Sequence, residues 1–418
     1  MARLFGLLLV LAACGDNHRL VPGAERPDAG PELPPADAPV DAPPVPPPSD
    51  YDPANTGFTG TLCHAGLRYG APNLTAPYVL ACTEDGGVFK TAPGAPLAWS
   101  NMNGTTITNP HGRGIAIAPD GPPVYYIADP TTGSNGFRSQ NQGTSWTAQS
   151  IGDPGAAREL FAFMFRRPLQ NLAASWDPVQ GAVVLHGNAP GLAAHAVGPS
   201  PGSVMGTPRG FASGGQSDVY VAVYGQTPSG AAAGGGIFHA CDLTAMAGGS
   251  YEERDAGLAA DDRDRVWSLA VDPASITSEP FACGATTVTG AATTYYAALR
   301  GGGQIYKTTD AGATWRKANA GLPAGAEVYE IAIDCFSATP AALCQDHQLL
   351  YAATSAGLYA SSDGGASWRL DGFAGAVVRT VALDPQPATS PPHRFVGVVD
   401  DVGIYQSRAP AGSQGSAP

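Results

Sequence analysis

The sequence predicts an all-β protein built as a single seven-bladed β-propeller, although six or eight blades also fit the pattern. Three observations predict this fold. Glycine accounts for 54 of 418 residues and charged residues for only 14%, a composition typical of short strands joined by tight turns. An octapeptide ending in tryptophan occurs at 139–146, 308–315 and 361–368. Around it lies a repeat of about 40 residues with three or four short apolar runs, which indicates a propeller before other folds.

Four copies of the repeat are regular. Each has an apolar run, a variable loop, a second apolar run, a glycine-rich turn and a third run. The four copies begin at 112–120, 266–273, 328–334 and 377–385. The segments 78–99 and 218–242 are degenerate copies, and the first places Trp99 where the octapeptide has its tryptophan. The segment 158–187 is the least regular and is counted as the remaining blade.

The last copy ends after its third strand, near Ser407. A propeller that ends one strand short usually takes its missing strand from the beginning of the domain, which removes exposed edges. We expect this closing strand near residues 57–62. The propeller then covers residues 53–410, and a short disordered tail follows at 411–418.

The first 52 residues predict an export signal and a spacer. The apolar run Leu4–Ala13 is too short for a membrane-spanning helix and fits a secretory signal. The sequence Leu11-Ala12-Ala13-Cys14 resembles the bacterial lipobox, which implies lipidation of Cys14 and a lipid anchor in a bacterial membrane, at the outer membrane or cell surface. Residues 15–52 are rich in proline and predict a disordered stalk. A peptide recognised by a proline-binding domain is the alternative.

Six further cysteines predict disulfides, because an even number in an exported chain is typical of an oxidising compartment. Proximity along the chain favours the pairs Cys63–Cys82, Cys241–Cys283 and Cys335–Cys344. Zinc is the alternative, but no CxxC is present, and His64 and His347 lack ligand spacing.

The net charge of −13 argues against a nucleic-acid partner, because the chain has too few cations to neutralise a row of phosphates. No phosphate-binding loop, GxSxG or HExxH motif is present. Acidic loops would suit Ca²⁺, but no DxDxDG pattern supports it. We therefore predict no cofactor, no metal and a monomeric protein.

The three octapeptides resemble the Asp-box, or BNR repeat, whose pattern is Ser/Thr-x-Asp-x-Gly-x-x-Trp in the superfamily of sialidases, sortilin and xyloglucanases. The carboxylate would accept backbone N–H bonds, the glycine would supply a positive φ, and the tryptophan would supply apolar area. In the family these turns join the third and fourth strands on the face opposite the usual site, which implies a structural role. The matching residues are Asn141, Gly143, Trp146, Asp310, Gly312, Trp315, Asp363, Gly365 and Trp368.

Candidate binding residues follow from the geometry of a propeller, whose innermost strands begin at the face that normally binds ligand. Aligning the apolar cores of four inner strands gives polar and aromatic residues two positions upstream, namely Arg113, Trp267, Tyr329 and Arg379. The loops after the second strands add Arg300. Candidate carboxylates at this face are Glu84, Asp85, Asp129, Asp400, Asp401 and Glu330. The alternative is that aspartate is enriched in any tight turn and pairs with arginine at the surface.

Two function classes fit these residues. The first is non-catalytic binding of a glycan or protein ligand at the cell envelope. The second is a glycoside hydrolase that uses the carboxylates of this face, which would then lie about 5–10 Å apart. Because no catalytic set is complete, binding is the favoured reading and no catalytic residue is assigned.

The resemblance to known hydrolases is partial. A sialidase needs three arginines and a tyrosine activated by glutamate. The family's Arg-Ile-Pro signature is missing, and Tyr329 and Glu330 are strand neighbours that point to opposite faces. The stretch 81–90 is similar to the first-blade loop of Asp-box endo-glucanases and xyloglucanases, with Glu84 at the carboxylate position and Cys82 replacing arginine. Those enzymes use two propellers, and this chain predicts one.

Overall fold

The structure is a computed structural model that describes most of the chain after residue 49. The described residues are 50–54, 57–70, 78–92, 98–108, 112–117, 124–128, 136–149, 159–166, 170–177, 180–187, 193–198, 205–215, 218–240, 251–277, 281–283, 286–288, 292–334, 349–383, 394–399 and 403–407.

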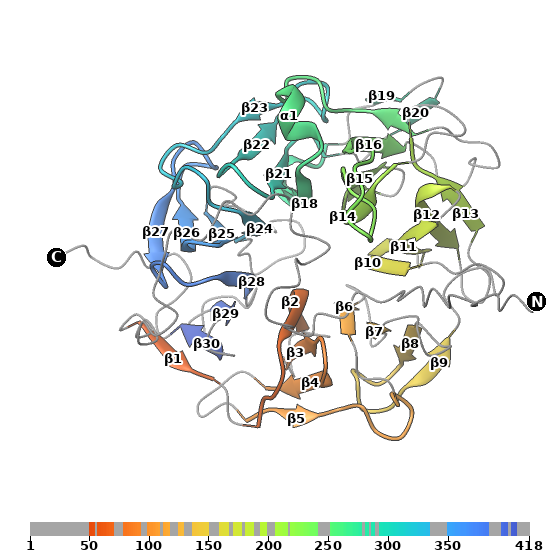
Figure 1. Ribbon diagram of the computed structural model, residues 1–418, viewed down its shortest axis with the longest axis vertical. Helices are drawn as coiled ribbons and strands as arrows, with labels where there is room; N and C mark the ends of the chain where they lie inside the picture. Colours follow the sequence, from red (N-terminus) through yellow and green to blue (C-terminus); the bar gives the residue numbers. More distant parts are fainter. Residues whose placement is uncertain are drawn as a thin grey trace, which may run out of the picture.

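These residues form seven four-stranded antiparallel sheets around a common centre, so the predicted all-β propeller is confirmed (Figure 1). The segment 158–187 contributes to the third of these blades. The first three blades are β2 to β5 (Leu62–Gly70, Tyr78–Thr83, Gly87–Thr91, Ser100–Asn101), β6 to β9 (Gly112–Ile117, Val124–Ala128, Gly136–Ser139, Thr147–Gln149) and β10 to β13 (Glu159–Arg166, Gln170–Asp177, Gly181–Gly187, Ala193–Ala196). The fourth and fifth are β14 to β17 (Thr207–Gly215, Asp218–Tyr224, Gly236–Ala240, Glu252–Glu253) and β18 with β21 to β23 (Val266–Val271, Tyr295–Leu299, Ile305–Thr308, Arg316–Lys317). The sixth and seventh are β24 to β27 (Val328–Ile333, Leu350–Thr354, Gly357–Ser361, Arg369–Gly372) and β28 to β30 with β1 (Val378–Leu383, Arg394–Val398, Gly403–Ser407, Tyr51–Pro53).

Three smaller elements lie in the connections before and within the fifth blade, between β17 and β21 in chain order. They are the short helix α1 (Ala260–Arg263), the 3-10 turn Pro273–Ser275, and the hairpin of β19 (Phe281–Cys283) and β20 (Thr286–Val288).

The second strands of the fifth and sixth blades are mostly apolar because blades cover both of their faces. In β21 and β25 every residue is buried, including Tyr295, Tyr296 and Tyr351. Alternate residues of β21 contribute to different apolar clusters: Tyr295 packs with Tyr220 of the preceding blade, whereas Tyr296 packs with Leu350 of the following blade. The core is therefore divided into layers between neighbouring blades.

The ring is closed by β1, which pairs with β30 in antiparallel register, Tyr51 opposite Ser407 and Pro53 opposite Tyr405 (Figure 1). The prediction of a closing strand near 57–62 was wrong, because Leu62 already begins the innermost strand of the first blade. The intervening chain must cross from the outer edge of the last blade to the centre of the first. Tyr51 and Asp52 lie in the range that the sequence analysis assigned to the stalk.

A buried polar cluster holds β1 against the sixth blade. The Tyr51 hydroxyl donates to Asp371 Oδ2 at 2.9 Å. The guanidinium of Arg394, only 3% exposed, lies 3.2 Å from the same carboxylate oxygen and donates to the Tyr351 hydroxyl at 3.0 Å. The ring of Phe373 packs on Tyr51 at 4.8 Å. The closure therefore combines three backbone pairings with a desolvated ion pair.

Each octapeptide turn is closed by its own side chains. Asp310 Oδ1 accepts from Thr308 Oγ1 at 2.6 Å and from the Thr314 backbone N–H at 2.8 Å. Asp363 makes the same bonds with Ser361 and Ser367. Burial alone would raise the pKa of Asp310, but these hydrogen bonds outweigh it and hold the pKa below its usual range.

The same bonds form around Asn141, whose amide oxygen accepts from Ser139 Oγ and from the Ser145 N–H, both at 2.8 Å. An acceptor oxygen, rather than a charge, is what this turn requires.

The tryptophan of each turn ties its blade to the preceding one. Its indole N–H donates to the backbone carbonyl of the residue that follows the outermost strand of the preceding blade. The four pairs are Trp99 to Ala54 at 2.5 Å, Trp146 to Met102 at 2.8 Å, Trp315 to Arg254 at 2.7 Å and Trp368 to Ala318 at 2.7 Å. Trp99, which lacks a complete octapeptide, makes this bond to the residue after β1. The tryptophans thus occupy equivalent places around the ring.

In the fourth blade the equivalent position belongs to Tyr251, which directly precedes the outermost strand β17. Its ring is buried in the layer shared with the third blade, but among the described residues its hydroxyl has no hydrogen-bond partner. Burial raises the pKa of Tyr251 well above its usual value. Sequence reasoning missed this residue because the octapeptide around it has been lost.

We expect Tyr251→Phe to change the free energy of unfolding by less than about 0.5 kcal/mol, because the hydroxyl that it removes makes no bond with the described residues. Trp368→Phe should destabilise by about 2 kcal/mol or more, because it leaves the Ala318 carbonyl unpaired and removes apolar volume. Urea unfolding followed by circular dichroism measures both. Equal losses would show that the indole bond is not what joins the blades.

Candidate ligand-binding rim

The inner strands carry a β-bulge at one common level. The ladder to the second strand skips one residue in six blades, and the skipped residues are Arg113, Phe161, Arg209, Trp267, Tyr329 and Arg379. A bulge re-aims the side chain of its extra residue. We call these six positions the bulge rim. Three arginines and three aromatic residues therefore occupy equivalent backbone positions near the beginning of the innermost strands.

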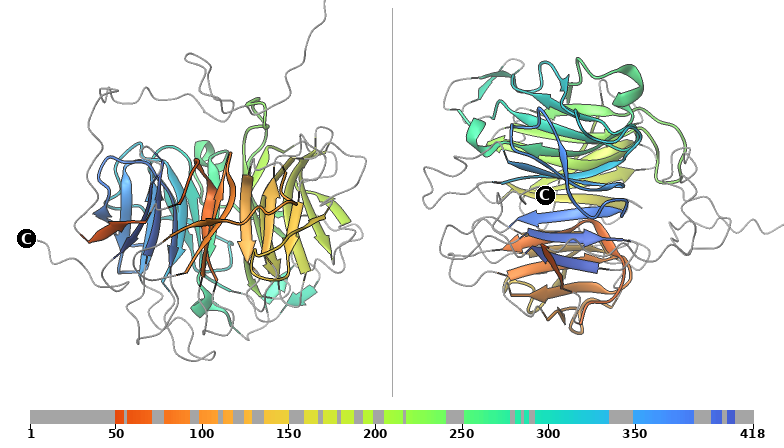
Figure 2. Two further views of the ribbon diagram at one scale, coloured as in Figure 1. Left: turned by 90° about the horizontal axis from the view of Figure 1, so that it is seen from below. Right: turned by 90° about the vertical axis from the view of Figure 1, so that its left-hand side faces the viewer.

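The bulge rim and the octapeptide turns lie at opposite ends of the blades. Figure 2 shows the blades from the side. In the fifth blade, Val266 beside the bulge pairs with Leu299 at the end of β21. Tyr295, at the other end of β21, pairs with Thr308, the first residue of the octapeptide. The turns that join the blades are thus remote from the rim.

Four rim residues follow from the sequence alignment of inner strands, but Arg209 was missed. Its blade has no tryptophan octapeptide to fix the alignment. A signal was present nonetheless, because Arg209-Gly210-Phe211-Ala212 matches Arg113-Gly114-Ile115-Ala116 at three of its positions. Phe161 had no comparable signal.

Trp267 lies beneath arginines rather than open to solvent. Its side chain is 2% exposed. The guanidinium carbon of Arg209 lies 4.4 Å from the centroid of its ring system and that of Arg300 lies 4.8 Å away, while Tyr224 contacts it edge-on at 5.1 Å. Cation–π contacts of this kind fix the arginines in place. The indole is therefore a support for two cations, not a free platform for a sugar ring.

Tyr329 is held in the same way. It is 6% exposed, and the guanidinium carbon of Arg379 lies 5.2 Å from its ring centroid. Its hydroxyl donates to Glu327 Oε2 at 2.7 Å, and Arg300 Nε lies 3.3 Å from both oxygens of Glu327. Burial and the Glu327 carboxylate raise the pKa of Tyr329 well above its usual value. The tyrosine therefore stays protonated at neutral pH.

Glu330 faces away from Tyr329 and joins three blades. Its Oε1 lies 3.0 Å from Arg68 NH1 on β2. Its Oε2 accepts from Thr380 Oγ1 on β28 at 2.7 Å and from the Val381 N–H at 3.3 Å. The carboxylate is thus engaged across the junction where the last blade meets the first.

Of the other candidate carboxylates, two lie in described parts of the chain. Glu84 and Asp85 form the turn between β3 and β4, and Asp85 Oδ1 accepts from the Thr61 N–H at 3.3 Å. Outside the described residues lie Asp129, Asp400, Asp401 and Cys14, and only the backbone of Arg113 is described, in β6.

The predicted disulfide between Cys63 and Cys82 is present, with a Cα–Cα distance of 5.5 Å. It joins β2 to β3 of the first blade, within the irregular stretch between Leu62 and Leu67. Cys283 ends β19, whereas Cys241, Cys335 and Cys344 lie outside the described residues, and so do the two pairings predicted for them.

Within the described ranges no three His, Cys, Asp or Glu side chains come together as metal ligands do. The same ranges hold no helix with the length and apolar character needed to span a membrane.

No protein-family model matches the sequence, and no curated protein is significantly similar to it. Among solved structures, the chain is similar to the extracellular domain of BT4673, described as a one-component system, from B. thetaiotaomicron, with a TM-score of 0.56 and 10% identity over 86% of this chain and 40% of that one. YCF48 from Cyanidioschyzon merolae matches with a TM-score of 0.52 and 12% identity over 86% of this chain and 98% of that one.

A GH74 xyloglucanase from Xanthomonas campestris matches with a TM-score of 0.54 and 16% identity, over 88% of this chain and 54% of that one. The chain therefore spans under two thirds of the BT4673 domain and of the xyloglucanase, but almost all of YCF48. At these identities the likeness concerns architecture alone, and the chain is a β-propeller that shares its fold with the BT4673 extracellular domain, YCF48 and a xyloglucanase.

Proposed function

We propose that this chain is an extracytoplasmic, non-catalytic β-propeller of the Asp-box type that binds its ligand at the bulge rim. One observation carries the proposal. The inner strands break their ladders at one level, and three of the residues placed there are arginines. Bulges are over-represented at functional rims, where they re-aim a side chain at the cost of ladder pairing.

The chemistry of the rim favours an acidic ligand. Arg209 and Arg379 are partly exposed, and aromatic rings fix their guanidinium groups, whereas the neighbouring Arg300 is paired with Glu327. Pre-positioned guanidinium groups bind carboxylates with geometric specificity and a small entropic cost. Trp267 and Tyr329 are too buried to stack on a neutral sugar. Between the glycan and the protein that the sequence allows, an acidic segment of a protein fits better.

A propeller of similar architecture with a bound peptide supports this choice of ligand. A solved structure with the same fold, at 12% identity and a TM-score of 0.52, is YCF48 bound to the D1 peptide. The Cys63–Cys82 disulfide supports export, because such bonds persist in oxidising compartments. A lipid anchor at Cys14 would then hold the propeller at the envelope.

Hydrolysis of a glycan is the second candidate, since a GH74 xyloglucanase shares the fold and Glu84 and Asp85 lie in a second-to-third-strand turn. Glu327 and Glu330 fit this role poorly, because each is held in an ion pair with an arginine.

Peptide and glycan arrays probed with the purified chain test the proposal. We expect acidic peptides to bind, and the double variant Arg209→Gln/Arg379→Gln to weaken binding about tenfold or more. Arg369→Gln, which alters an exposed arginine on the outermost strand β27, should bind like the parent chain. Release of reducing sugar from xyloglucan, lost in Glu84→Gln, would instead establish the hydrolase. Equal binding by the rim variant and the control would exclude the rim as the site.

A further inference from the structure

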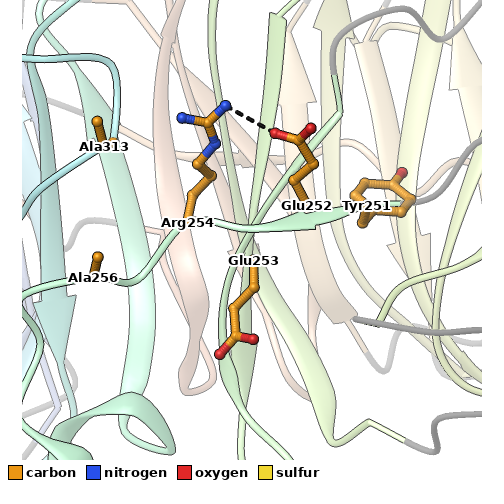
Figure 3. A pocket seen from close by; sticks show the side chains of 7 residues that line it. Tyr251, Glu252, Glu253, Arg254, Ala256 and Ala313 are labelled. Carbon is orange, nitrogen blue, oxygen red and sulfur yellow. Dashed lines mark hydrogen bonds and ion pairs between the residues drawn. The ribbon is translucent and has the colours of Figure 1, made fainter. Parts of the chain in front are cut away.

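Between neighbouring blades, the outermost strand of one and the octapeptide turn of the next enclose a groove. Figure 3 shows the groove between the fourth and fifth blades, of about 600 Å³, where Glu252 and Glu253 form the outermost strand. Arg254 lies 2.8 Å from Glu252, and Arg263 lies 3.3 Å from Glu253. The charges in this groove are therefore matched by neighbours.

The corresponding groove between the fifth and sixth blades, of about 320 Å³, is basic. Its outermost strand β23 consists of Arg316 and Lys317, and Lys307 of β22 lies behind them. The carboxylate in its wall, Asp310, is already bonded within its own turn by Thr308 and Thr314. The amino group of Lys317 lies on the other face of the sheet, 3.7 Å from Asp262 and 5.8 Å from the centroid of the Tyr306 ring. The groove therefore holds more positive than negative charge.

The strand register places two of these positive charges close together, which raises the free energy of the folded state. Lys307 lies directly opposite Arg316 in the antiparallel ladder. Directly opposite side chains share a face of the sheet, and like charges there are destabilising. At the same level of other blades a cation faces a neutral residue, as in the pairs Lys90–Ser100 and Arg138–Thr147. The fold therefore does not require two cations here.

The surroundings of Lys307 do not remove the conflict. Its amino group donates to the Gly364 carbonyl at 2.8 Å and lies 5.3 Å from the centroid of the Tyr296 ring. Burial lowers the pKa of Lys307, although the carboxylates of Asp272 and Asp363 act in the opposite direction. Lys90 makes the same kind of bond to the Gln142 carbonyl in the next turn, but it lies opposite Ser100 and not opposite a second cation.

The next turn leaves room beside this cation. Gly364 occupies the position held by Gln142 and Ala311 in the other two octapeptides, and all three have positive φ. A Cβ at Gly364 would lie 3.2 Å from Lys307 Nζ. A side chain is thus tolerated at this turn position elsewhere, and glycine at 364 keeps space open next to Lys307.

We propose that the groove between the fifth and sixth blades binds a sulfate or phosphate group through Lys307 and Arg316, which share one face of the sheet. A doubly charged oxyanion would offset the repulsion between Lys307 and Arg316, and the guanidinium can donate to it with two N–H groups. The site lies at the octapeptide end of the blades and is independent of the bulge rim.

Isothermal titration calorimetry of the full chain tests this, with sodium sulfate and inorganic phosphate at an ionic strength held constant with sodium chloride. We expect saturable binding by the parent chain and about tenfold weaker binding by Arg316→Gln. Lys317→Gln should bind like the parent chain, because Lys317 lies opposite Tyr306 on the other face of the sheet. Arg369→Gln is the matched control, because Arg369 faces the uncharged Ala360 on the next outermost strand. A sulfated disaccharide, compared with free sulfate, tells whether the group is bound alone or on a sugar.

Thermal unfolding gives a second measurement, in which Arg316→Gln should not lower the Tm although it weakens sulfate binding. In chloride buffer Arg316→Gln should unfold at the same temperature as the parent chain or a higher one, because repulsion is relieved, but it should lose the rise in Tm that sulfate produces. The absence of saturable binding, or equal binding by Arg316→Gln and Arg369→Gln, overturns the proposal. The Arg209→Gln/Arg379→Gln variant should bind sulfate normally, so the two proposals fail independently.

Discussion

Replacing Asp371 with alanine is expected to destabilise the propeller by about 3–5 kcal/mol, because it leaves the guanidinium of Arg394 buried without its carboxylate. It also removes the acceptor of the Tyr51 hydroxyl and so loosens the closing strand. Chemical denaturation of the variant and the parent chain measures the loss. The double variant Asp371→Ala/Arg394→Met should recover much of it, since no uncompensated charge then remains.

An exposed ion pair provides the control. Arg263 and Glu253 are each about two-fifths exposed and lie 3.3 Å apart. Glu253→Ala should cost no more than about 1 kcal/mol. A loss at Asp371 as small as this would mean that the closure does not depend on the buried pair and is held by the β1–β30 ladder and Tyr51 packing.

The second large effect is expected at Gly321, where alanine should destabilise the chain severely or prevent folding. Gly321 has φ of +91°, and a Cβ on it would collide with the backbone carbonyl oxygen of Trp368. Because both groups are backbone, neither can move aside cheaply. Gly257 makes the same contact with the carbonyl of Trp315, so Gly257→Ala should behave alike.

A variant at Gly325 shows how much of the loss in stability at Gly321 comes from the steric collision and how much from the positive φ. Its φ of +90° matches that of Gly321, but a Cβ there would meet nothing within 4 Å. Gly325→Ala should therefore cost only the left-handed backbone strain, about 1–2 kcal/mol. Unfolding midpoints of the two variants give the comparison. Similar midpoints would mean that the Trp368 carbonyl does not rest on Gly321 in solution.

The sequence predicted the propeller because its blades repeat the same apolar runs and the same tryptophan turn. It did not predict the closing strand, since β1 has only three residues and its partner lies at the other end of the chain. The role of Tyr251 was not predicted because a tyrosine stands where the other turns have tryptophan. Arg209 was not predicted because its blade has no complete octapeptide.

The candidate site was predicted only in part. Aligning inner strands found the rim positions of Arg113, Trp267, Tyr329 and Arg379. It could not show that Trp267 and Tyr329 are covered by arginines, because Arg209 and Arg379 come from neighbouring blades. Nor does a sequence reveal which cations stand opposite each other across a ladder, as Lys307 and Arg316 do.

The indole bonds bear on how such proteins diverge. Each tryptophan binds a main-chain oxygen, and the four residues that supply it are an alanine, a methionine, an arginine and another alanine. Since every amino acid carries that oxygen, mutation on the receiving side leaves the attachment intact. Only the tryptophan side chain must be kept for the bond to form. The sequences of the acceptor segments can therefore diverge while the contact between blades is retained.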